Sequence, residues 1–215
     1  SAHHFLGYIQ NHDQVGNRAL GERLEHLVGM DASKVALGIV LTAPFVPMLF
    51  MGEEFAASAP FLYFADHEEE EMRRLVSEGR KRDFAAFGWE EAEVPDPELV
   101  ETFEKSRLDW SEARTGKHAE MFDWVKQLIQ LRRQSVDLND GNFGHLKVEC
   151  LSEERVLEMR RGSVRVLANL SDAPATVKAL GGESLRLSSH HAIVSSDTGI
   201  VLPGMSLAIL VSGAE

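Results

Sequence analysis

Residues 5–18 read FLGYIQNHDQVGNR, and this stretch decides how the rest of the chain is interpreted. It starts with a short apolar run that is typical of a buried parallel strand, then changes abruptly to Asn-His-Asp-Gln and a glycine. In sheets whose strands alternate with helices, polar side chains converge on a ligand at the carboxyl ends of the strands. Residues 11–14 therefore form either a ligand site or an ordinary turn and helix cap, and local chemistry leaves both readings open.

The next 30 residues predict one more strand and the helix that precedes it. Asp31 offers a helix N-cap, and residues 32–43 are apolar nearly all round, which predicts a largely buried helix that ends before Pro44. The apolar run Val46 to Met51 then predicts a second parallel strand.

Charged residues follow both predicted strands. Asn17, Arg18 and Arg23 lie in the loop after the first strand, where each can reach a ligand or only hold the shape of the loop. Glu53 and Glu54 follow the second strand and invite comparison with the carboxylate pair of glycosidases. Because neighbours on an extended strand point to opposite faces, we expect no such pair here. One glutamate is expected to pair with an arginine and the other to face solvent or substrate.

Composition excludes several classes of function. The chain has 215 residues, 44% of them hydrophobic, and a net charge of −12 without a Lys/Arg-rich run, which argues against nucleic acid as a partner. No apolar run is long enough for a membrane span. The single Cys150 excludes an internal disulfide and fits a cytoplasmic protein. The nine histidines lack zinc-site spacing and no phosphate-binding glycine loop is present, so neither a metal nor a cofactor is expected.

Residues 56–115 form a long insertion. Its aromatic segment, residues 60–64, can stack on sugar rings or pack as an apolar loop under a lid. Asp66 and Glu69 have the spacing of a capping box and predict the start of a helix, which the basic run of residues 80–82 is expected to close.

The carboxyl-terminal part has a different pattern. Apolar positions recur at helical spacing from about His118 to Ser135, which predicts an amphipathic helix. From about residue 140, short strands alternate with turn signals, which predicts an antiparallel β-sandwich over residues 139–215. The expected strands are Leu146 to Cys150, Val156 to Arg161, Val164 to Leu170, Ala175 to Leu180, Ala192 to Ser195 and Ser206 to Val211.

Three stretches carry a resemblance to a known family. Residues 7–18 (GYIQNHDQVGNR) resemble the last catalytic signature of the α-amylase superfamily, glycoside hydrolase family 13. Residues 44–55 (PFVPMLFMGEEF) and 60–67 (PFLYFADH) are similar to its members that act on malto-oligosyltrehalose. The resemblance implies an α/β fold plus an all-β domain. Residues 1–138 would be the carboxyl-terminal part of a (β/α)8 TIM barrel that carries the insertion, and the β-sandwich domain would follow.

The resemblance also implies an activity and a site. The whole enzyme would be a retaining hydrolase that cleaves the α-1,4 bond next to a terminal trehalose and releases trehalose. Asp13 would stabilise the transition state and His12 would bind the sugar ring, with Asn11, Gln14 and Arg18 as further substrate contacts. Because the family carries its nucleophile and general acid on earlier strands, this portion alone is expected to be inactive.

Two alternatives remain open from the sequence. The chain could be part of another α-glucan enzyme, such as a branching enzyme or an amylase, although residues 62–67 argue against this. It could instead be a non-catalytic glucan-binding or assembly fragment. Exposed surfaces of a partial barrel would also favour self-association.

Overall fold

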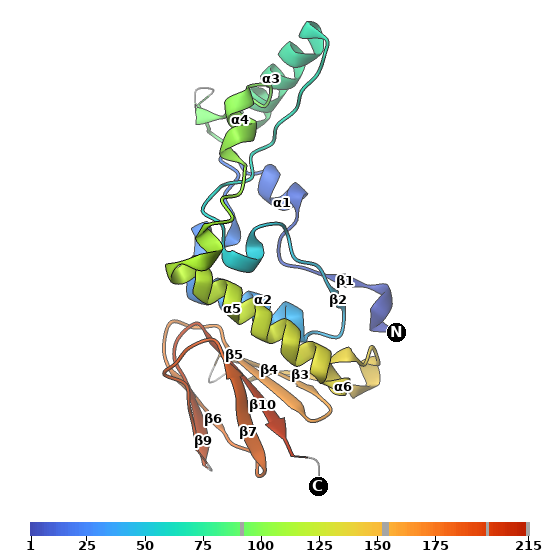
Figure 1. The fold of residues 1–215 in the computed structure, drawn as a ribbon, viewed down its shortest axis with the longest axis vertical. Helices are drawn as coiled ribbons and strands as arrows, with labels where there is room; N and C mark the ends of the chain where they lie inside the picture. Colours follow the sequence, from blue (N-terminus) through green and yellow to red (C-terminus); the bar gives the residue numbers. More distant parts are fainter. Residues whose placement is uncertain (91–92, 152–154, 197, 214–215) are drawn as a thin grey trace.

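The computed structural model describes residues 1–90, 93–151, 155–196 and 198–213. The molecule is elongated (Figure 1). Two antiparallel sheets lie at one end, and two long helices lie against the larger of them. A helical arm, formed within residues 56–115, extends to the opposite end. No helix in these ranges is long and apolar enough to cross a membrane.

The first 145 residues are mainly helical. Their elements are η1 (Ala2–His4), β1 (Leu6–Gly7), α1 (His12–Gly16), α2 (Leu24–Thr42), β2 (Val46–Pro47), η2 (Glu53–Phe55), α3 (Glu70–Ala85), α4 (Val100–Lys105), η4 (Glu112–Arg114), α5 (Gly116–Gln134), α6 (Val136–Asn139) and η5 (Phe143–His145).

The strands β1 and β2 pair in parallel, as expected, but both are only two residues long. Leu6 lies opposite Val46 and Gly7 opposite Pro47. The predicted strands over residues 5–9 and 46–51 were therefore too long. The proline has no N–H to donate to the ladder, and beyond Gly7 the chain leaves the pair to form the polar loop.

The helix α2 starts earlier than predicted. It begins at Leu24, and Gly29 interrupts its helical geometry with φ of 82°. Asp31 therefore lies inside α2 and is not its N-cap. The Ser33 hydroxyl donates to the Gly29 carbonyl (2.8 Å) across this kink. The second half is largely buried, as predicted, and it ends at Thr42 just before the proline-containing turn.

The long helices α2 and α5 share one core with the larger sheet. Buried side chains of α5 include Met121, Trp124 and Leu128, and they pack with Leu37 of α2 and Leu207 of the sheet. The Trp124 indole N–H donates to the Lys34 carbonyl (2.9 Å). The predicted amphipathic helix is thus confirmed, and its apolar stripe faces α2 and the sheet.

The carboxyl-terminal residues form two antiparallel sheets. The strands of the first sheet, in spatial order, are β3 (Leu146–Leu151), β4 (Val156–Arg161), β5 (Val164–Asn169), β10 (Ser206–Ser212) and β7 (Glu183–Ser188). Those of the second are β6 (Ala175–Lys178), β9 (Gly199–Leu202) and β8 (Val194–Ser195). All six predicted strands are present, some shorter than expected. The sequence analysis missed β7, whose residues are all at least partly exposed, and β9, which lies directly after a turn signal.

A second core lies between the sheets. Leu167, Ala208 and Leu210 of the five-stranded sheet pack with Ile200 and Leu202 of β9. The central strand β5 is buried at all six positions, since its alternate residues face the helices and the smaller sheet. The larger sheet therefore joins the helical part to the smaller sheet.

In the arm, the helix α3 differs from the sequence prediction at both of its ends. The N-cap is Glu69, and it makes no side-chain capping bond. Asp66 lies too far before the helix to cap it, and its carboxylate instead accepts a hydrogen bond from Arg73 Nη2 (3.0 Å). The capping-box expectation was wrong. The helix also continues beyond the basic run to Ala85, and none of its residues is buried.

Two glycines provide a test of the core packing. A Cβ added at Gly38 of α2 would meet Leu207 Cδ1 at 2.7 Å, whereas one at Gly79 of α3 would meet nothing closer than 3.9 Å. We expect Gly38→Ala to lower the free energy of unfolding by about 1 to 3 kcal/mol through overpacking. The matched control Gly79→Ala should stabilise α3 by up to about 1 kcal/mol. Urea unfolding measures both changes, and equal effects would contradict this account of the α2 interface.

Candidate functional site

The polar stretch after β1 forms a short helix with a defined start. Asn11 is the N-cap of α1, and its Oδ1 accepts a hydrogen bond from the Gln14 backbone N–H (2.8 Å). This bond satisfies one of the free N–H groups that every helix start presents. The capping reading of residues 11–14 is therefore correct for Asn11. Its side chain is half-buried and turned back onto its own helix.

The next residues of α1 present their side chains to solvent. The side chains of His12 and Asp13 are 71% and 73% exposed, and His12 Nε2 lies 3.3 Å from Asp13 Oδ1. Gln14 is exposed as well. The structure thus brings three of the five predicted site residues together at the surface, where a carboxylate, an imidazole and an amide can all reach a polyhydroxylated ligand.

Arg18 has a different environment. Its Nη1 donates to the Glu22 carbonyl (2.5 Å), and the side chain is half-buried. This contact holds the loop between α1 and α2 in shape. The sequence left open whether Arg18 reaches a ligand or holds the shape of the loop. Its hydrogen bond to Glu22 is a contact of the second kind.

Gln10 is a site residue that the sequence analysis missed. Its side chain is buried, its Oε1 accepts a hydrogen bond from the Leu24 N–H (2.6 Å), and its Nε2 donates to Glu53 Oε1 (3.4 Å). One side chain therefore links the end of β1, the start of α2 and the turn after β2. The sequence feature that could have identified Gln10 is its position between the apolar run and Asn11.

Glu53 and Glu54 lie in the turn η2 rather than on an extended strand. Glu53 is buried, and its Oε2 accepts a hydrogen bond from the Phe50 N–H (2.8 Å). Among the described residues no arginine forms an ion pair with Glu53 within 4.0 Å, although the charges of Glu53 and Glu54 act to raise the pKa of Arg23. Glu54 is half-buried and lines a cavity of about 720 Å³ beside Leu49 and α5. The two carboxylates thus differ in environment, as the sequence analysis expected, but for a different geometric reason.

Burial raises the pKa of Glu53 to about 7, with smaller increases from the neighbouring carboxylates of Glu25 and Glu54. The hydrogen bonds from Phe50 and Gln10 act in the opposite direction. Loss of water around the carboxylate is therefore the dominant effect at this position.

Arg23 fills the space behind this network. It is fully buried, and it donates from Nε to the Ala59 carbonyl and from Nη1 to the Met51 carbonyl, both at 2.7 Å. The guanidinium also lies 5.3 Å from the centre of the Phe50 ring. Burial lowers its pKa. Like Arg18, it holds backbone segments together, but unlike Arg18 it is fully buried.

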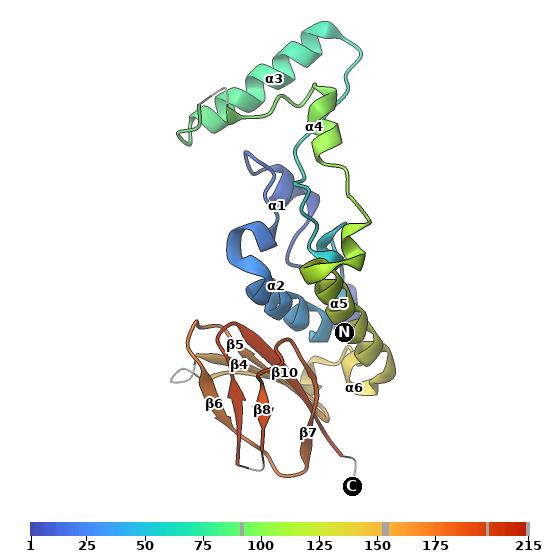
Figure 2. The ribbon, with the colours of Figure 1, turned by 60° about the vertical axis from the view of Figure 1, so that its left-hand side comes forward.

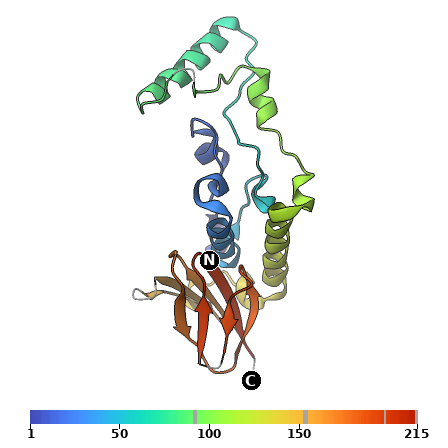
Figure 3. The ribbon, with the colours of Figure 1, turned by 90° about the vertical axis from the view of Figure 1, so that its left-hand side faces the viewer.

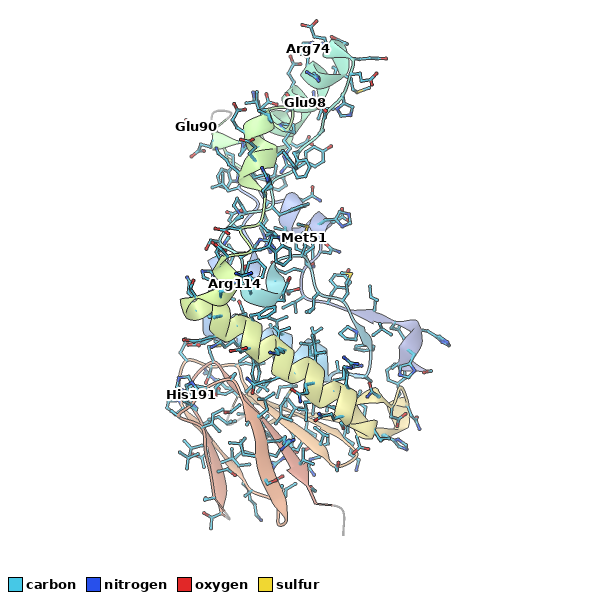
Figure 4. All side chains as sticks on the ribbon, viewed as in Figure 1. Met51, Arg74, Glu90, Glu98, Arg114 and His191 are labelled. Carbon is cyan, nitrogen blue, oxygen red and sulfur yellow. The ribbon has the colours of Figure 1, made fainter. Side chains whose placement is uncertain are left out.

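The aromatic segment both packs and remains partly open. The Phe61 ring packs edge-on against Phe50 (5.1 Å between centroids) and contacts Phe64 (6.0 Å), which in turn contacts Phe103 of α4 (5.2 Å). Phe64 also lines a cavity of about 590 Å³. Figure 4 shows Met51 near the middle of the molecule, and Glu98, which lines the same cavity as Phe64, farther out along the arm. Exposed aromatic surface thus continues outward from the strand ends.

No group of three or more His, Cys, Asp or Glu side chains suited to a metal ion occurs in the part of the chain that the structure describes.

The raised pKa of Glu53 predicts a pH-dependent stability. The unfolded chain loses this proton near pH 4.5 and the folded chain only near pH 7, so folding becomes less favourable as the pH rises across this range. The full difference corresponds to about 3 kcal/mol. We expect Glu53→Gln, a neutral mimic, to reduce this loss.

The measurement is urea unfolding of the parent and the variant at several pH values between 4.5 and 8. Glu54→Gln serves as the control because its side chain is only half-buried. If the parent and Glu53→Gln show the same pH dependence, the Glu53 carboxyl does not titrate as described.

Comparisons with known proteins identify relatives of nearly the whole chain. The chain is 44% identical over 201 residues to malto-oligosyltrehalose trehalohydrolase from Brevibacterium helvolum and 41% identical to that from a Rhizobium species. Each alignment covers 94% of this chain but only 33% or 34% of the relative. The relative from Saccharolobus solfataricus is 34% identical over 187 residues. The chain therefore spans about a third of the length of the curated relatives that it matches.

Comparison with solved structures also finds proteins that share the fold of nearly the whole chain. A Salmonella typhimurium protein, described as a candidate α-amylase, superimposes with a TM-score of 0.79 at 32% identity, over 97% of this chain and 35% of that one. An α-amylase from H. orenii, at 16% identity and a TM-score of 0.60, shows only that the fold is shared. A family model described as a domain of unknown function, DUF3459, matches residues 141–209. Over nearly its whole length, this chain is thus similar to malto-oligosyltrehalose trehalohydrolases of the α-amylase superfamily, and it fits the carboxyl-terminal portion of such a protein.

Proposed function

We propose that this chain is part of an enzyme that hydrolyses the α-1,4-glucosidic bond next to the terminal trehalose of malto-oligosyltrehalose. The observation that carries the proposal is the identity of 38–44% with trehalohydrolases from three different bacteria over at least 94% of the chain. A second observation that supports it is the exposure of the His12 and Asp13 side chains, which lie in α1 shortly after the strand β1.

The division of the chain into two parts belongs to the same proposal. Residues 1–138 would contribute the last strands and helices of a (β/α)8 barrel. The parallel pairing of β1 with β2, and the long helix after each strand, support this. Residues 139–215 would form a β-sandwich domain, and the core shared by the two antiparallel sheets supports that assignment.

Asp13 would accept hydrogen bonds from hydroxyl groups of the sugar at the cleavage site. Contacts that strengthen as the ring flattens toward an oxocarbenium ion accelerate the reaction, whereas contacts of equal strength throughout do not. His12 would donate to the same sugar. Gln14 is exposed and able to join them, while Asn11 and Arg18 would act mainly by holding α1 and its loop.

The nucleophile and the general acid would come from barrel strands outside this chain. Without them, bound glucan meets neither an attacking carboxylate nor a proton donor for the leaving group. We therefore propose a chain that binds glucan without cleaving it. A cytoplasmic location, which the single cysteine fits, remains part of the proposal.

Sugar binding at Asp13 is testable by calorimetry. We expect the parent chain to bind maltotriosyltrehalose, and Asp13→Asn to bind it about tenfold or more weakly, since hydrogen bonds to a charged group contribute more than neutral ones. Asp31→Asn, an exposed aspartate on α2, is the matched control. Trehalose release by the parent chain, or equal affinities for both variants and the parent, would contradict the proposed role.

Self-association is also expected, because apolar side chains around the strand pair are open. Phe5 and Leu6 are each 56% exposed, and Val46 is 41% exposed. A second copy covering these residues would remove their apolar surface from water. Sedimentation velocity should show a concentration-dependent dimer that Leu6→Lys weakens. A strictly monomeric parent at high micromolar concentration would exclude this partner.

A further inference from the structure

Arg80 connects the arm to the candidate site. It lies on α3, and its Nη2 donates to the Gly16 carbonyl (2.7 Å) and to the Arg18 carbonyl (3.2 Å). These acceptors are more than 60 residues away in sequence. In Figures 2 and 3, α3 crosses the end of the molecule beyond α1, on the side opposite the sheets. The contact therefore joins α3 of the arm to the end of α1 and the loop that follows it.

The guanidinium of Arg80 is held on several sides. It lies 5.0 Å from the centre of the Tyr63 ring and 4.7 Å from that of Phe84. Tyr63 belongs to the aromatic segment and Phe84 to α3 itself. A guanidinium that contacts two aromatic rings and donates to two carbonyls has less orientational freedom than an exposed arginine. Arginine also keeps its charge at any pH near neutrality.

The two acceptors lie at the carboxyl-terminal end of α1. Carbonyl groups at a helix end lack intrahelical partners, and a helix of a single turn is unstable by itself. Asn11 caps the start of α1 through Gln14, and Arg80 provides hydrogen bonds at its end. The exposed residues His12 and Asp13 lie between these two points.

Other arginines of α3 lack this environment. Arg74 is exposed and bonds only to Glu71 and Glu78 of its own helix, and Figure 4 shows it at the outer end of the arm. In the basic run that was interpreted as helix-end charge, Lys81 pairs with Asp96 (3.8 Å), whereas Arg80 reaches the backbone beside α1.

We propose that Arg80 is a positioning residue that fixes the orientation of α1, so that His12 and Asp13 face the glucan. It acts through α1 and touches no reacting atom. The inference rests on the proposed function for the identity of the ligand, but the contact itself is independent of it. It makes the arm of residues 56–115 a support for the site.

The test uses the full chain with three substitutions. Arg80→Met removes the donors and keeps much of the side-chain length, Arg80→Lys keeps the charge without the planar fork, and Arg74→Met is the matched control on the same helix. Carbonyl ¹³C resonances of Gly16 and Arg18 report the hydrogen bonds directly. The His12 ring resonances report the orientation of α1, and calorimetry with maltotriosyltrehalose reports the consequence for binding.

We expect Arg80→Met to move the Gly16, Arg18 and His12 resonances and to weaken binding about tenfold, because a small misplacement of binding groups is costly. Arg80→Lys should give smaller changes in the same direction, and Arg74→Met none. The inference is overturned if Arg80→Met leaves these resonances unchanged, or if it moves them while affinity stays that of the parent.

If the proposed function is wrong, the same experiment gives a result that differs from one in which only the role of Arg80 is wrong. If the parent itself binds no maltotriosyltrehalose, the glucan assignment fails, and the His12 and carbonyl resonances still decide whether Arg80 orients α1. If Arg80→Met does not fold, Arg80→Lys decides the question: unchanged resonances in that variant overturn the inference.

Discussion

The arrangement of the strand ends depends on the buried side chain of Gln10. Its amide oxygen accepts from the start of α2 and its amide nitrogen donates to Glu53 in the turn after β2. The β1–β2 ladder is only two residues long and could not by itself fix where these segments lie. An amide that both accepts and donates in a low-dielectric interior resists displacement, because any movement leaves a buried polar group without a partner. Burial raises the pKa of the Glu53 carboxyl in this network, and the hydrogen bonds from Phe50 and Gln10 only partly offset that increase.

From this anchor the chain changes from buried to exposed within three residues. Gln10 is buried, Asn11 is half-buried, and both His12 and Asp13 are largely exposed. A binding group must combine exposure with a fixed position, and these two requirements conflict for a side chain on a free loop. Here the fixed position comes from neighbours on each side, namely the buried Gln10 and the cap at Asn11 before the exposed pair, and the Arg80 contact after it.

The elements that the sequence predicts well are those with a complete local signal. The helix α5 follows from its apolar periodicity, and the strands β4, β5 and β10 follow from short segments that contain Val, Leu or Ile and are bounded by turn signals. The parallel partnership of β1 and β2 also follows from their apolar runs, but their length does not, because Pro47 interrupts donation and the Gln10 contacts draw the chain away. The predicted start of α2 was also wrong, because a local signal was misleading. Asp31 looks like a cap, but the break in helical geometry lies two residues earlier, at Gly29, and helix is present on both sides of that kink.

The candidate site, too, could be recognised only in part from the sequence. The motif of residues 11–14 is visible as a polar run. The Gln10–Glu53 and Arg80–Gly16 hydrogen bonds instead span 43 and 64 residues, and no local pattern encodes them. Arg80 illustrates the limit, since adjacent basic residues look equivalent in sequence and differ only in which rings and carbonyls surround them. A buried or stacked partner is a property of the fold. Supporting residues of this kind are therefore found by asking which long-range hydrogen bonds end on the backbone of an exposed motif, and here that question leads from α1 to the arm.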